Sequence, residues 1–209
     1  MARTNTGRWS IALVTAMVII SDAACGSAQS AGPLQTLSSG GQPYLAMASS
    51  DVVPGQPADA EAYVVNSAKD SVQITGVSAV PVSGEPTGRV MFVGLQSTGA
   101  SLASGHGWPP EVPVKPAIGA ELPHGEVGII FGIIGPAGAR HYAIAGLLVH
   151  YKYHGALFTT VAWAGEAGCV ADSWRPGASN WKSEAAACQA FTEKVNGILE
   201  KTAAALVVE

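Results

Sequence analysis

The sequence predicts a mainly β protein, in which an antiparallel β-sandwich of about seven strands is followed by a C-terminal α-helix. Between residues 43 and 165, short apolar runs with strand-like alternation are separated by turn signals. No helical pattern alternates with these runs, which disfavours a parallel α/β fold. Beyond residue 165 the apolar spacing changes to that of a helix. The expected divisions are a signal peptide (1–24), a flexible tether (25–42), the β-sandwich domain (43–165), and a disulfide loop with the C-terminal helix (166–209).

The first 24 residues have the pattern of an export signal. Arg3 and Arg8 give a positive start, and the mostly apolar run Trp9–Ile20 follows. Twelve residues are too few to span a bilayer, which takes about 20, but they suit the apolar region of a signal peptide. We therefore expect the chain to be exported.

The residues around Cys25 resemble the cleavage region of bacterial lipoproteins, in which small residues precede a cysteine that becomes lipidated. Ala23 and Ala24 fit that pattern, whereas Asp22 stands where an apolar residue is usual. The resemblance implies a lipid anchor at Cys25, and lipid chains there would hold the protein on a membrane. The alternative is ordinary signal cleavage after Ala28, which would give a secreted protein. The Gly-, Ser- and Gln-containing stretch up to residue 42 is typical of a tether.

Seven segments between the tether and residue 165 are strand candidates. Gly76 shifts the alternation within one of them, which predicts a bulge. The dipeptide His154-Gly155 predicts a tight hairpin turn. The segment from Glu126 to Ile134 is continuously apolar and is expected to be a central strand buried on both sides. The candidates are Tyr44–Ala48, Ala60–Asn66, Ser71–Val80, Arg89–Leu95, Glu126–Ile134, Ala143–Tyr153 and Leu157–Trp163.

A Gly- and Pro-rich excursion separates two of these strands, from Gln96 to Gly125. Connections of this length are uncommon in compact domains unless they have a function or are disordered. Trp108 lies in this excursion, and Trp174 lies in the later loop between the two remaining cysteines. Exposed tryptophans often mark recognition surfaces, so both are candidate partner-binding residues. The alternative is that each covers one end of the sandwich.

The C-terminal segment has the spacing of an amphipathic helix. Trp181, Cys188 and Val195 recur at intervals of seven and form an apolar stripe. Asn180 is positioned to cap the helix start. Gly197 costs a helix interior about 1 kcal/mol relative to alanine, so a kink or an end is expected there.

If Cys25 carries lipid, Cys169 and Cys188 are the only remaining cysteine pair. In an exported protein we expect them to form a disulfide. Free thiols are an alternative, and so is a metal site. The metal site would need two further ligands at suitable spacing, and no Cys-x-x-Cys motif is present.

Two family resemblances bear on the fold and the location. The string Ala62-Tyr63-Val64-Val65-Asn66 with Asp70 is similar to the opening hairpin of exported bacterial immunoglobulin-like domains. The segment Tyr151–Gly155, followed by a late cysteine, resembles small surface lipoproteins of an uncharacterised family. The resemblance implies an immunoglobulin-like sandwich on a cell surface.

The other resemblance is to periplasmic copper chaperones with a cupredoxin-like sandwich. Pro54, Gly55, Tyr63, Asn66 and Asp70 match the opening of those proteins. Their copper site needs a His-x-Met pair, and none of the five histidines of this chain stands two residues before a methionine. We therefore expect no metal site, and metal handling stays an alternative function.

The remaining patterns argue against enzymatic chemistry and against nucleic-acid binding. The formal net charge of −4 offers no basic surface for phosphate backbones. Ser179 begins a Ser-x-x-Lys match, but the partner motifs of that chemistry are absent. The carboxylates considered for acid–base work are Glu121, Glu126, Glu166 and Asp172, which spacing alone cannot bring together.

We therefore expect no catalytic residue and no cofactor. The predicted function is that of an exported, membrane-anchored, non-enzymatic binding or scaffold module of the cell envelope. Its expected partners are the membrane, through the lipid anchor, and an unidentified envelope protein or cell-wall component. The alternative to a binding module is an exported hydrolase whose site carries no recognised motif.

Overall fold

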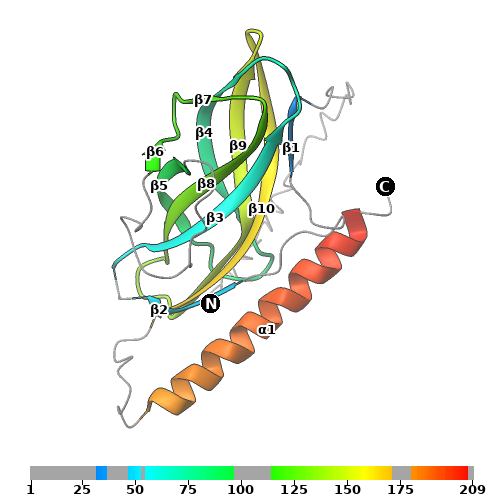
Figure 1. Cartoon of the computed structure of the whole chain (residues 1–209). Coiled ribbons are helices and arrows are strands. Elements are labelled where there is room, and N and C mark those ends of the chain that lie inside the picture. The colour runs from blue at the N-terminus through cyan, green and yellow to red at the C-terminus, as the bar shows by residue number, and fades with distance from the viewer. Residues whose placement is uncertain (1–31, 37–46, 53–54, 97–113, 171–179, 207–209) are drawn as a thin grey trace, which may run out of the picture. The chain divides into compact units, whose positions relative to one another are not determined.

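A computed structural model describes residues 32–36, 47–52, 55–96, 114–170 and 180–206 of the chain. This part is mainly β, with two sheets and one C-terminal helix, as the sequence predicts (Figure 1). No helix among the described residues is long and apolar enough to span a membrane. The elements are β1 (Leu34–Thr36), β2 (Met47–Val52), β3 (Ala58–Asn66), β4 (Val72–Pro81), β5 (Arg89–Gln96), β6 (Val114–Pro116), β7 (Glu121–Leu122), β8 (Gly125–Ile134), β9 (His141–Tyr153), β10 (Ala156–Val170) and α1 (Trp181–Leu206).

The strands form two five-stranded sheets. Sheet A has the order β1-β3-β8-β5-β6, and sheet B has the order β2-β10-β9-β4-β7. The pairs are antiparallel, except that β2 runs parallel to β10 along the edge of sheet B. Ten strands are described where the sequence predicts about seven, and three of them (β1, β6 and β7) have only two or three residues.

Several predicted boundaries differ from the structure. β1 lies inside the predicted tether and pairs with β3, so the folded part begins before residue 43. β10 continues to Val170, past the predicted end of the sandwich at residue 165. β6 and β7 lie inside the predicted Gln96–Gly125 excursion, where they pair with β5 and β4. Short edge strands such as these depend on a partner strand distant in sequence, which local alternation does not reveal.

The core lies between the two sheets. β8 is the middle strand of sheet A, and Ile129, Phe131 and Ile133 on its inner face are fully buried. Ile130, on its other face, is also fully buried, as expected for a strand covered on both sides. In sheet B, alternate residues of β9 (Leu147, Val149 and Tyr151) point into the same core, as their period-2 pattern predicts.

The predicted turn and bulge are both present. His154 and Gly155 have φ angles of 47° and 84°, the left-handed values that a type I′ hairpin turn requires. The register between β4 and β9 shifts between Ile74 and Gly76, where the sequence predicts the bulge.

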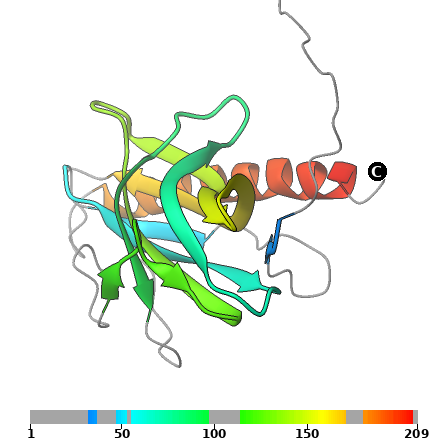
Figure 2. The ribbon, with the colours of Figure 1, turned by 90° about the horizontal axis from the view of Figure 1, so that it is seen from above.

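The helix α1 packs on the outer face of sheet B (Figure 2). Val195 and Leu199 of α1 are buried against small residues of the strands, which let the helix approach closely. Those small residues are Ala143, Ala145 and Ala167. The helix does not end at Gly197, because the packed residues on both sides of Gly197 offset its cost of about 1 kcal/mol.

Two further contacts fix α1 to the rest of the protein. Cys169 of β10 and Cys188 of α1 form a disulfide, with their Cα atoms 5.8 Å apart, as the sequence predicts. Lys194 forms an ion pair of 2.5 Å with Glu85, whose side chain is only 7% exposed. At the helix start, the carbonyl of Asn180 accepts hydrogen bonds from the backbone N–H groups of Ser183 and Glu184.

Candidate functional site

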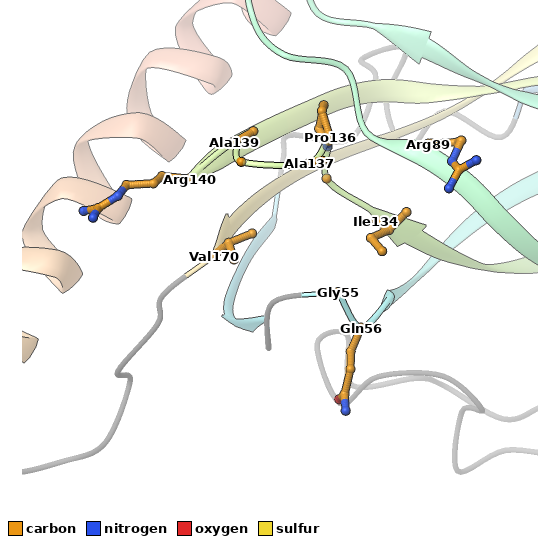
Figure 3. Close-up of a pocket in the computed structure, with 11 residues that line it drawn as sticks. Gly55, Gln56, Arg89, Ile134, Pro136, Ala137, Ala139, Arg140 and Val170 are labelled. Atoms are coloured by element: carbon orange, nitrogen blue, oxygen red, sulfur yellow. The ribbon is translucent and has the colours of Figure 1, made fainter.

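A pocket lies at one end of the sandwich, where the β8–β9 loop meets the start of β5 and the end of β10 (Figure 3). Its volume is about 450 Å³. Small loop residues form most of its wall, and two arginines also line it. The lining residues are Gly55, Gln56, Arg89, Ile134, Gly135, Pro136, Ala137, Gly138, Ala139, Arg140 and Val170.

Backbone hydrogen bonds hold the β8–β9 loop in shape. The N–H of Ala139 donates to the carbonyl of Pro136 at 3.0 Å, and Gly138 between them has a φ of +77°. This is a type II turn, in which glycine is favoured at the third position. The N–H of Val170 donates to the carbonyl of Arg140 at 2.8 Å and ties the loop to β10. The pocket wall is therefore formed before any ligand arrives.

Arg89 and Arg140 are the two arginines of the described residues, and both line this pocket. Both side chains are exposed. Figure 3 shows them at opposite ends of the pocket, with the Arg140 side chain extended toward α1. No ion pair joins either guanidinium to a carboxylate of the described chain. Within the described part of the chain, no carboxylate neutralises either positive charge.

The pocket wall rests on a buried tyrosine. A Cβ at Gly135 would overlap the ring of Tyr142, and so would one at Gly168, the residue that faces Tyr142 across the strand pair. Tyr142 is fully buried, and its hydroxyl has no hydrogen-bond partner among the described residues. Burial raises the pKa of Tyr142, and the negative charge of the nearby Glu166 raises it further. The phenol therefore stays neutral at physiological pH and offers no charge to the pocket.

Tyr142 and Tyr151 should make the protein less stable at alkaline pH. Burial is the main cause that raises the pKa of each above the ordinary value of 10.0. The free energy of unfolding is therefore unaffected by these tyrosines below pH 10 and falls as pH rises further, because the unfolded state then releases protons that the folded state keeps. The ionisation of Tyr142 should lower the free energy of unfolding by up to about 1.4 kcal/mol for each pH unit above 10, and Tyr142→Phe should abolish this contribution. Urea unfolding between pH 9 and pH 11.5 measures the difference.

Urea unfolding at pH 7 distinguishes the contributions of the two tyrosine hydroxyls to stability. Tyr142→Phe should leave stability unchanged or raise it by about 1 kcal/mol, because it removes a buried hydroxyl with no described partner. Tyr151→Phe should lower stability by about 1 kcal/mol, because the Tyr151 hydroxyl accepts a hydrogen bond from the N–H of Leu34 at 3.4 Å. A loss of stability in Tyr142→Phe at pH 7 would contradict this interpretation.

The described residues include only some of the predicted site residues. The lipidation candidate Cys25 and the partner-binding candidates Trp108 and Trp174 lie outside them. Cys169 and Cys188 are brought together in the disulfide.

The carboxylates considered for catalysis are not brought together. Glu121 and Glu126 are exposed at the opposite end of the sandwich from the pocket, where Glu121 accepts a hydrogen bond from Ser71 at 2.6 Å. Glu166 is 2% exposed on β10. Across sheet B, Glu121 of β7 is level with Leu157 of β10. Leu157 precedes Glu166 by nine residues along β10, so the two carboxylates are about 30 Å apart. Asp172 lies outside the described residues.

Sequence reasoning missed the two arginines of the pocket. Arg89 begins one of the predicted strands and Arg140 falls between two others, and neither residue is among the predicted site residues. The available signal was that Arg89 and Arg140 each stand at a strand end, beside a glycine-containing turn. Their common position depends on the pairing of Arg89 with Ile134 across β5 and β8, which is not local in sequence.

No family model matches this chain, and no curated protein matches it significantly. Within the described ranges, no group of three or more His, Cys, Asp or Glu side chains is placed to hold a metal ion.

Proposed function

We propose that the protein is an exported lipoprotein, anchored to the cell membrane through Cys25, whose sandwich domain is a non-enzymatic binding or scaffold module of the cell envelope. We also propose that the sandwich is of the immunoglobulin-like kind, because two mainly antiparallel sheets enclose one apolar core. Its partner would be an envelope protein or a cell-wall component.

Two features support the export part of the proposal. The N-terminal sequence combines Arg3 and Arg8, a twelve-residue apolar run and two alanines before Cys25. Independently, Cys169 and Cys188 are placed for a disulfide, a bond that persists in oxidising compartments outside the cytosol.

The pocket is the observation that carries the binding part of the proposal. Among the described residues, the only ionisable ones that line it are Arg89 and Arg140. Arginine stays protonated in proteins, so it can attract and orient an anion but cannot act as a general base near neutral pH. A wall of small, hydrogen-bonded loop residues with two fixed charges suits recognition better than proton transfer.

Cell fractionation tests the anchor. The wild-type chain should sediment with membranes and need detergent for release, whereas Cys25→Ala should lose the lipid and shift toward the soluble fraction. Cys188→Ala serves as a control, because it removes a cysteine without touching the anchor. Equal membrane binding of wild type and Cys25→Ala would contradict lipid anchoring at this residue.

The hydrolase alternative has its own test. A reproducible hydrolytic activity that disappears on replacement of Glu121, Glu126, Glu166 or Asp172 would overturn the non-enzymatic assignment. We expect these variants to differ from the wild type in stability only.

A further inference from the structure

The pocket and the start of β1 lie at opposite ends of the sandwich. Gly32 and Pro33 lie at the end of the sandwich where β3 finishes, since the N–H of Ser67 donates to the carbonyl of Pro33 at 3.0 Å. The pocket lies at the other end of β3, where Ala58 pairs with Ile133 beside the pocket residue Ile134. The eight residue steps from Asn66 to Ala58 separate the two ends by about 26 Å.

The chemistry of the pocket selects for anions. Arg89 and Arg140 each carry a permanent positive charge on a planar fork of N–H donors, which matches the oxygens of phosphate and carboxylate groups. The chain as a whole has a net charge of −4, so attraction of an anion to this place would come from the local pair and not from the overall charge.

The arrangement of the two arginines further restricts the ligand. They lie at opposite ends of the pocket, separated by the Gly135–Ala139 loop, and the Arg140 side chain extends toward α1 (Figure 3). An extended molecule with several anionic groups can contact two separated guanidinium groups at once, and linking two weak contacts in one molecule strengthens the whole.

We propose that this pocket binds an extended polyanion, whose successive phosphate or carboxylate groups contact Arg89 and Arg140 across the β8–β9 loop. This inference rests on the proposed binding function and names the chemical class of its ligand.

Titration of the detergent-solubilised full chain with two polymers tests the proposal. Long-chain inorganic polyphosphate supplies repeated phosphates, and polygalacturonate supplies repeated carboxylates, so the pair distinguishes the two sources of negative charge. At least one should bind, with an affinity that falls as salt rises. Arg89→Gln and Arg140→Gln should each weaken binding about tenfold, as the loss of one charge-assisted hydrogen bond predicts.

Control variants make the outcome specific. Lys115→Gln and Lys152→Gln remove equally exposed positive charges away from the pocket and should leave binding unchanged. Inorganic phosphate at the same phosphate concentration should not displace the polymer. Melting temperatures should stay equal, because neither arginine has a described ion-pair partner to lose.

Three results would overturn the inference. They are the absence of binding to both polymers, equal losses in the arginine and lysine variants, and displacement of the polymer by inorganic phosphate. The assay is done in solution, so it gives the same answer whether or not Cys25 carries lipid. A failure here is therefore distinguishable from a failure of the proposed anchor.

Discussion

Truncation of Phe131 to alanine is expected to lower the free energy of unfolding by about 3–5 kcal/mol, the usual cost for a buried phenylalanine. Phe131 is fully buried in the core and lies on β8, the middle strand of sheet A. Its strand neighbours are Ala60 of β3 and Val93 of β5. Because hydrogen-bonded strands flank it on both sides, the backbone cannot collapse to fill the space, and the cavity would persist.

Phe92→Ala is the matched control for this prediction. Phe92 lies on the neighbouring strand β5, pairs with Gly132 and is 43% exposed. Its truncation removes the same atoms but less buried area, so the loss should be clearly smaller. Urea unfolding of both variants measures the difference, and equal losses would contradict the placement of Phe131 in the core.

Removal of the disulfide is expected to have the next largest effect. Cys188→Ser should lower the free energy of unfolding by about 2–4 kcal/mol, the typical contribution of one bridge. The bond joins β10 to α1 across a sequence separation of 19 residues, so it restricts the unfolded chain over that whole loop. The helix should remain docked, because Val195 and Leu199 keep their contacts with sheet B.

Two comparisons separate the bond from the substitution itself. Reductant added to the wild type should reproduce most of the loss, and Ala187→Ser, at an exposed neighbouring position of α1, should have little effect. An unchanged denaturation midpoint in Cys188→Ser would contradict the prediction. So would alkylation of both cysteines in native protein without reductant.

The parts of the fold that the sequence predicts are those whose signals are local. The alternation along β9 places Leu147, Val149 and Tyr151 in the core, and the dipeptide His154-Gly155 marks the turn that follows. The apolar stripe of α1 is also local, and it places Cys188 and Val195 on the buried side of the helix. Each of these signals is contained within a few consecutive residues, where side-chain periodicity decides the exposed face.

The parts that were missed depend on contacts between distant segments. β1 is a strand only because Leu34 and its neighbours pair with β3, some thirty residues away. The parallel pairing of β2 with β10 joins Met47 to Glu166, which no local pattern encodes. The pocket is a further case, because Arg89 begins β5 and Arg140 lies in the β8–β9 loop, and the two line the same pocket only after β5 pairs with β8.

Intact-mass analysis of the protein from native membranes tests the central proposal, an exported and lipid-anchored chain, most directly. The proposal predicts a chain that begins at Cys25, carries a diacylglyceryl adduct and lacks the two hydrogens lost in the Cys169–Cys188 bond. A lipid-free chain that begins at Gln29, or an unprocessed chain with free thiols at Cys169 and Cys188, would contradict it.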